Sequence, residues 1–151
     1  MNKVMLATER ELNILLVEDD EVDVMNVQRA LKKNNITSPL YRAANGIEAL
    51  TMLRSNQVLT TDPLRRLLIL LDLNMPKMGG LEFLKELRAD PTLRHLPVVI
   101  LSTSKQDDDL ATAYEYNVAG YILKPVTYSN FVETIDILNR YWLLSELPQP
   151  R

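Results

Sequence analysis

The sequence contains no cysteine, one histidine and only four glycines among its 151 residues. Without cysteine there is no disulfide framework and no thiol chemistry, which suits a reducing compartment such as the cytoplasm. One histidine excludes most histidine-built metal sites, and four glycines are too few for a glycine-rich phosphate-binding loop. These absences exclude a disulfide framework, thiol chemistry, most histidine-built metal sites and a glycine-rich phosphate-binding loop.

Long apolar runs and a surplus of positive charge are also missing. No stretch approaches the ~18 apolar residues of a membrane-spanning helix, and residues 1–7 lack the apolar core of a signal peptide. The formal net charge of -3 argues against nucleic acid binding, because such proteins usually carry a basic face. We therefore expect a cytoplasmic protein of one domain that binds neither membranes nor nucleic acids.

Five apolar segments alternate with five segments of helical periodicity. The apolar segments are residues 12–17, 39–44, 67–71, 97–101 and 119–123. The helical segments begin near residues 21, 46, 81, 107 and 128, and the last runs to about residue 147. This alternation predicts an α/β fold, in which helices cover both faces of a parallel sheet.

The central apolar segment ends in a carboxylate. Residues 67–71 (Leu-Leu-Ile-Leu-Leu) show no alternation, which is typical of a strand buried on both faces. Asp72 follows directly, and a buried, unpaired charge is costly. Asp72 must therefore lie at the mouth of the sheet, where open α/β folds bind their ligands.

Three other strands end in residues suited to chemistry, namely Glu18 and Asp19, Ser102, and Lys124. Parallel strands place these ends at one edge of the sheet, where adjacent carboxylates repel unless a cation balances them. A hard divalent cation such as Mg²⁺ fits oxygen ligands, and Lys124 and Ser102 can contact phosphoryl oxygens. We therefore interpret Asp72 as a nucleophile that accepts a phosphoryl group as an acyl phosphate.

Four motifs at these strand ends resemble those of bacterial response-regulator receiver domains. They are Val17-Glu18-Asp19, residues 71–76 (Leu-Asp-Leu-Asn-Met-Pro), residues 101–104 (Leu-Ser-Thr-Ser) and residues 120–125 (Gly-Tyr-Ile-Leu-Lys-Pro). The set is specific because it keeps the family's order and spacing across roughly residues 11–140. The resemblance implies a flavodoxin-like (CheY-like) five-stranded parallel sheet in the order 2-1-3-4-5. Residues 1–10 would then be a tail, and residues 141–151 an extension of the last helix.

The resemblance also implies roles for particular residues. Asp72 is the implied phosphoacceptor, Lys124 the phosphate contact, and Ser102 and Tyr121 the switch pair. The implied Mg²⁺ ligands are Glu18, Asp19, Asp72 and the Asn74 backbone carbonyl. The implied function is a response regulator, not an enzyme, that takes its phosphoryl group from a sensor histidine kinase. Without a DNA-binding domain, it would signal through protein contacts or by passing the phosphoryl group on.

Several features depart from the usual family pattern. Gly79 stands where the family more often has aspartate, which predicts a weaker cap for the following helix. The loop at residues 56–66 is longer than usual. Together with the tail at residues 141–148, it resembles the small regulators of cyanobacterial and bacterial phytochrome kinases. The family often has a cis bond after its conserved lysine, so the resemblance makes Lys124–Pro125 a candidate cis bond.

The last helix carries more apolar residues than one face needs. Phe131, Ile135, Leu138 and Trp142 form one stripe, whereas Val132, Ile137, Tyr141 and Leu144 fall largely outside it. A helix that is apolar on more than one face usually has a second partner. We expect a homodimer built on this helix and on the face with Tyr121 and Tyr128. The alternative is a helix covered by its own tail.

Two other functions fit parts of the pattern. A Mg²⁺-dependent phosphohydrolase could use residues 72–74 (Asp-Leu-Asn), but the second aspartate of its Asp-x-Asp motif, the acid/base, is absent. A binding domain that works without phosphorylation would be unaffected by Asp72→Asn. The receiver interpretation predicts that this substitution abolishes phosphorylation and signalling.

Overall fold

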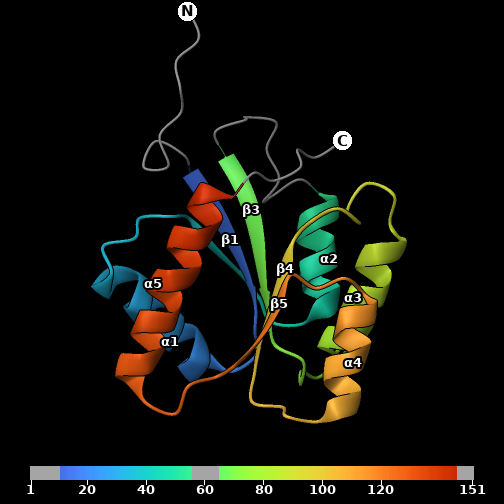
Figure 1. Cartoon of the computed structure of the whole chain (residues 1–151). Coiled ribbons are helices and arrows are strands. Elements are labelled where there is room, and N and C mark those ends of the chain that lie inside the picture. The colour runs from blue at the N-terminus through green and yellow to red at the C-terminus, as the bar shows by residue number, and fades with distance from the viewer. Residues whose placement is uncertain (1–10, 56–64, 146–151) are drawn as a thin grey trace, which may run out of the picture.

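The computed structural model describes residues 11–55 and 65–145. In these ranges five strands alternate with five helices, which confirms the predicted α/β fold (Figure 1). Three expected features fall wholly or partly outside the described residues. They are the tail at residues 1–10, residues 56–64 of the long loop, and residues 146–151 of the extension.

The strands form one parallel sheet in the predicted order β2-β1-β3-β4-β5. Their bounds are β1 Glu11–Val17, β2 Leu40–Ala43, β3 Arg65–Leu71, β4 Val98–Ser102 and β5 Gly120–Leu123. β1 pairs with β3 so that Val17 lies opposite Leu71. The next residue of each strand, Glu18 and Asp72, therefore leaves the sheet at the same edge.

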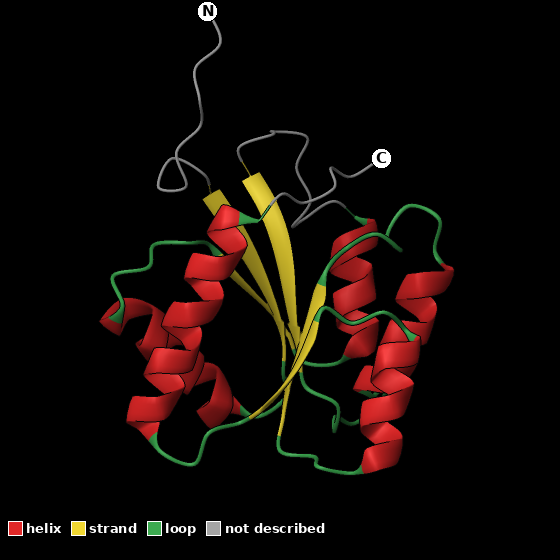
Figure 2. Ribbon diagram, in the orientation of Figure 1, coloured by secondary structure: helices red, strands yellow, loops and turns green. Residues whose placement is uncertain are grey.

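The helices form two layers, one on each face of the sheet, as Figure 2 shows in red around the yellow strands. Their bounds are α1 Glu21–Lys33, α2 Gly46–Arg54, α3 Gly80–Ala89, α4 Asp107–Glu115 and α5 Tyr128–Leu144. Because side chains alternate along a strand, Leu15 and Val17 of β1 pack toward α2, α3 and α4. Ile14 and Leu16 pack toward α1 and α5. Each face thus has its own apolar core.

Side-chain caps determine where most of the helices that surround the site begin. Asp20 accepts hydrogen bonds from backbone N–H groups at the start of α1, Asn45 caps α2, and Thr127 caps α5. Such oxygens satisfy amides that have no partner within the helix. The cap position of α3 is Gly79, which offers no side-chain cap, as expected from a glycine where the family more often has aspartate.

Gly80 allows α3 to start close against the end of β3. A Cβ atom at this position would lie 2.5 Å from the Asp72 carbonyl oxygen and 2.7 Å from the Leu73 Cα. Its amide donates to the Leu73 carbonyl at 2.9 Å, which closes the turn after the strand. The turn that carries Asp72 therefore depends on a residue without a side chain.

Three local expectations were wrong. β3 begins at Arg65 instead of Leu67, because residues 65 and 66 pair with Glu11 and Leu12 of β1; the buried Arg66 also donates a hydrogen bond to the Trp142 carbonyl. α5 ends at Leu144, before residue 147, because Ser145 is extended and its hydroxyl bonds back to Tyr141. The Lys124–Pro125 bond is trans, the isomer that most X–Pro bonds adopt.

α5 is amphipathic, but both of its faces carry apolar residues. Phe131, Ile135 and Trp142 are buried against the sheet. Ile137, Tyr141 and Leu144 are 53%, 62% and 70% exposed on other sides of the helix.

Among the described residues, no helix combines the length and apolar character needed to cross a membrane.

Candidate functional site

Three carboxylates meet where the strands end, as the sequence predicted. Glu18 and Asp19 follow β1 and Asp72 follows β3, and one oxygen from each lies within 4.8 Å of the other two. Glu18 is 3% exposed and Asp72 7% exposed, whereas Asp19 is more open to solvent. The two buried carboxylates are held close together by the register of β1 and β3.

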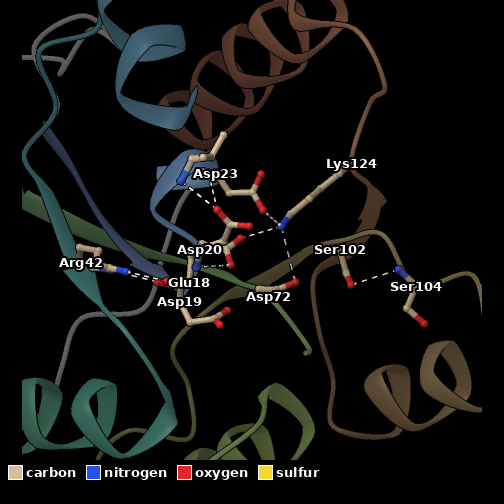
Figure 3. A network of polar contacts seen from close by, with 10 residues as sticks. Glu18, Asp19, Asp20, Asp23, Arg42, Asp72, Ser102, Ser104 and Lys124 are labelled. Atoms are coloured by element: carbon tan, nitrogen blue, oxygen red, sulfur yellow. Dashed lines mark hydrogen bonds and ion pairs between the residues drawn. The ribbon is translucent and has the colours of Figure 1, made fainter. Parts of the chain in front are cut away.

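The ammonium group of Lys124 reaches these carboxylates from the end of β5 (Figure 3). Its Nζ lies 2.6 Å from Glu18 Oε1, 2.8 Å from Asp23 Oδ2 and 3.7 Å from Asp72 Oδ1. The lysine backbone is fixed as well, because its amide donates to the Ser102 carbonyl at 2.8 Å. Lys124 therefore counters several carboxylates at once and forms its short contacts with Glu18 and Asp23.

Burial and mutual repulsion disfavour the ionised forms of the two buried acids. Burial, aided by the charge of Asp72, raises the pKa of Glu18 to about 7 although Lys124 opposes the change. Burial also raises the pKa of Asp72, with a contribution from Asp19 and again against Lys124. Burial alone would lower the pKa of Lys124, but its hydrogen bonds to Asp23 and Glu18 raise it. The lysine therefore stays charged while both acids lack sufficient counter-charge.

Arg42 of β2 fixes the backbone of the acidic loop, and the sequence analysis missed it. Its Nε donates to the Glu18 carbonyl at 3.0 Å, and its Nη2 donates to the Asp19 carbonyl at 3.1 Å. Its Nη1 pairs with Glu21 at 2.8 Å. The pairing of β2 with β1 brings this arginine to the loop. Only that pairing, not a local motif, could have pointed to the contact.

The two residues of the implied switch pair lie on adjacent strands and share a contact. Ser102 is fully buried at the end of β4, and its Oγ accepts a hydrogen bond from the Ser104 amide at 3.2 Å. The Tyr121 hydroxyl donates to the Ser104 carbonyl at 3.0 Å. Ser104 thus links the two. Asn74 is exposed in the loop two residues after Asp72.

The cluster of three carboxylates, Glu18, Asp19 and Asp72, is suited to a divalent cation. It offers three convergent oxygen ligands, and oxygen ligands are the kind that hard cations prefer. Two of the three acids have raised pKa values, so a bound cation would supply the counter-charge that Lys124 alone does not provide. The residues present therefore fit a metal ion of this type.

The fold and the site define the class of protein. A doubly wound α/β sheet carries, at its carboxyl-end edge, an acidic cation site beside a lysine. Residues 14–136 match the response regulator receiver domain family. The chain belongs to this family, and it is a receiver domain rather than a phosphohydrolase.

Two curated relatives cover most of the chain. The response regulator Rcp1 of Synechocystis is 37% identical over 130 residues, which are 86% of this chain and 88% of that protein. The probable methanogenesis regulatory protein FilR2 of Methanothrix harundinacea is 36% identical over 138 residues, or 91% and 88% of the two chains.

Solved structures of similar proteins agree with this fold. The phosphorylated cyanobacterial phytochrome response regulator RcpA matches with a TM-score of 0.80 and 35% identity, over 93% of this chain and 99% of that one. The Mn²⁺-bound form of Rcp1 matches with a TM-score of 0.77 and 34% identity, over 91% and 99% of the chains. Both structures share the fold over nearly their whole length.

Proposed function

We propose that this receiver accepts a phosphoryl group on Asp72 from a sensor histidine kinase. One observation carries the proposal. Asp72 lies in a group of three carboxylates whose oxygens are within 4.8 Å of each other, and a lysine ammonium is 3.7 Å from its Oδ1. A nucleophilic oxygen, a cation site and a fixed positive charge are the parts that phosphoryl transfer requires.

The proposed cation is Mg²⁺, held by Glu18, Asp19, Asp72 and the Asn74 carbonyl. When bound, it would neutralise charge on the phosphoryl oxygens. Lys124 would donate hydrogen bonds to the same group, and Ser102 would bind another oxygen through its hydroxyl. Three convergent carboxylates and the Mn²⁺-bound form of the relative Rcp1 support this assignment.

The transfer is a substitution at phosphorus. An Asp72 carboxylate oxygen forms the new P–O bond as the P–N bond of the kinase phosphohistidine breaks, and the electron pair of that bond stays on the imidazole nitrogen. To reach a phosphoryl oxygen, the buried Ser102 hydroxyl would turn toward Asp72. Because Ser102 and Tyr121 both contact Ser104, this movement would be passed to Tyr121 and the surface around α4.

The proposed donor is a phytochrome-type histidine kinase in the cytoplasm. RcpA, which matches over 93% of this chain, is a cyanobacterial phytochrome response regulator. The absence of cysteine fits a reducing compartment. Phosphoryl transfer from a purified phytochrome kinase, compared with an unrelated histidine kinase, would test the choice of donor.

Incubation with acetyl phosphate and Mg²⁺, followed by intact-mass analysis, tests the phosphoacceptor. The wild type should gain the mass of one phosphoryl group, while Asp72→Asn and a sample with excess chelator should gain none. Phosphorylation of Asp72→Asn to the same level would refute the assignment. Unaltered signalling by Asp72→Asn in cells would instead favour a binding domain that works without phosphorylation.

We further propose that the chain forms a homodimer through α5 and the face with Tyr121 and Tyr128. Ile137, Tyr141 and Leu144 leave an apolar surface exposed on a helix whose other face already covers the sheet. Light scattering of the phosphorylated and unphosphorylated protein would measure the mass. Tyr141→Glu should give monomers, whereas Ile47→Glu, at an exposed apolar position of α2, should not. A monomeric wild type at micromolar concentration would contradict the dimer.

A further inference from the structure

Lys124 forms its short contacts with residues other than the proposed phosphoacceptor. Its Nζ donates to Glu18 Oε1 at 2.6 Å and to Asp23 Oδ2 at 2.8 Å. The distance to Asp72 Oδ1 is 3.7 Å, which is too long for a hydrogen bond. In this structure, therefore, the ammonium group forms only a longer ion pair with Asp72 and lies nearer to Glu18 and Asp23 (Figure 3).

Asp23 comes from the first turn of α1, and it is not one of the three convergent carboxylates. Its amide donates to Asp20 Oδ1 at 3.3 Å, so the helix cap fixes its backbone while its carboxylate faces Lys124. The side chain of Asp23 is 35% exposed and that of Lys124 is 13% exposed. The pair is thus partly shielded from solvent, where an ion pair is stronger than on an open surface.

We propose that Asp23 is a positioning residue that restrains Lys124 in the unphosphorylated protein. A phosphoryl group on Asp72 would compete with Asp23 for the position of Lys124, because two of its three N–H donors are directed to Asp23 and Glu18 and the ammonium group stays 3.7 Å from Asp72 Oδ1. The strength of the Asp23–Lys124 pair then sets how readily the phosphorylated form accumulates. This inference rests on the proposed function of Asp72 and deepens it.

A simpler role for Asp23 is that of an acidic residue at a helix N-terminus, where it would favour the helix dipole. Glu21 provides the matched control, because it lies in the same first turn and pairs with Arg42 instead of Lys124. If helix charge were the whole effect, Glu21→Gln and Asp23→Asn would behave alike. If restraint of Lys124 is the effect, only Asp23→Asn should change the site.

The test is the affinity for beryllium fluoride in the presence of Mg²⁺, measured by calorimetry. Beryllium fluoride is a stand-in for a phosphoryl group on a carboxylate. Asp23→Asn should bind it about threefold more tightly, the size of effect that a partly shielded ion pair supports. Glu21→Gln should match the wild type. Asp23→Glu, which can still reach Lys124, should restore affinity toward the wild-type value.

A double-mutant cycle separates restraint of Lys124 from simple repulsion between Asp23 and the anion. In a Lys124→Gln background, the effect of Asp23→Asn should disappear. An undiminished effect in that background, or equal or weaker binding by Asp23→Asn alone, would overturn the role of Asp23. A wild type that binds no beryllium fluoride and accepts no phosphoryl group would instead overturn the assignment of Asp72, and with it this inference.

Discussion

The interior of the sheet and its carboxyl-end edge consist of the same strands but differ in how their side chains are satisfied. Along β3, residues 67–71 are apolar and buried between two helix layers. One residue further on, Asp72 is equally buried but shares its surroundings with two other carboxylates and one lysine. Residues 67–71 place no charges in the interior, whereas the edge holds three carboxylates and one lysine close together.

The difference shows that the edge is arranged for binding rather than for stability. Burial raises the pKa of both Glu18 and Asp72, which means that their ionised forms are disfavoured in the folded protein. A protein tolerates such a group only when packing elsewhere compensates for it. We therefore expect substitutions in the interior to reduce stability, and substitution of a buried acid at the edge by its neutral amide to raise it.

Phe83→Ala should give the largest effect. Phe83 of α3 is fully buried in the core on the α2–α4 side, and its removal should destabilise the protein by about 3–5 kcal/mol. Urea unfolding would measure the change. Ile47→Ala, at a position that is 52% exposed, is the control and should change stability little. A small loss of stability for Phe83→Ala would mean that this core is loosely packed. It would weaken the contrast between the interior and the edge of the sheet.

Substitution of a buried residue usually destabilises a protein, but Glu18→Gln should stabilise this one at high pH. The pKa of Glu18 is about 7 in the folded state instead of 4.5. Between these values the folded protein keeps a proton that the unfolded chain has released, so stability falls as pH rises through the window. Without divalent cations, Glu18→Gln should be more stable than the wild type by about 2–3 kcal/mol at pH 8.

The gain from Glu18→Gln should shrink toward pH 5, because the folded wild type is then protonated at Glu18. Urea unfolding at both pH values, with a chelator present, gives the comparison. The same pH dependence in both proteins would show that Glu18 is not the group that titrates. With Mg²⁺ present, the wild type should bind the cation more weakly below pH 7, since binding requires ionised carboxylates.

Arg42→Gln should have an intermediate effect at the edge. It removes two hydrogen bonds to backbone carbonyls of the loop that carries Glu18 and Asp19, and an ion pair with Glu21 of α1. We expect a loss of about 1–2 kcal/mol of stability and Mg²⁺ affinity lower by about tenfold, as for other residues that orient metal ligands. Arg140→Gln, which breaks an exposed pair with Asp136, is the control and should leave affinity unaltered. Unchanged Mg²⁺ affinity in Arg42→Gln would show that the loop holds its own shape.

Gly79→Asp should give the smallest change among these variants, a slight increase in the free energy of unfolding. α3 begins without a side-chain cap, and Gly79 already has the extended backbone of a cap residue. A Cβ atom there would lie 3.4 Å from the Leu73 carbonyl oxygen, which is close to ordinary contact. An aspartate should therefore add about 0.5 kcal/mol in thermal or urea unfolding. Gly79→Ala separates the cap from the added Cβ, and an equal gain in both variants would exclude capping.

The sequence allowed the fold and the acidic group to be predicted because their signals are local. Continuous apolar runs mark the central strands, and the first polar residue after each run marks a strand end. Parallel strands then require those ends to share one edge. Glu18, Asp72 and Lys124 were brought together by this reasoning without any knowledge of long-range contacts, and the structure confirms their proximity.

Contacts between distant parts of the chain could not be predicted in this way. From the sequence alone, Asp23 looks like an ordinary residue of a helix start, and only the fold, which brings the residue after β5 to the first turn of α1, makes it a partner of Lys124. Arg88 likewise binds four backbone carbonyls in the loops before β4 and β5, among them that of Tyr116 at 2.7 Å. The sequence predicted a loop at Arg66, although this residue lies in a buried strand and its side chain reaches α5.

The central claim is that the three carboxylates form a cation site that includes Asp72. The most direct measurement is a Mg²⁺ titration of the wild type and of Asp72→Asn at pH 8. The unfolding temperature is recorded at each Mg²⁺ concentration. The wild type should be stabilised as Mg²⁺ increases, and Asp72→Asn should need about tenfold more Mg²⁺ or show no shift. Equal stabilisation of both proteins at the same concentrations would contradict the account.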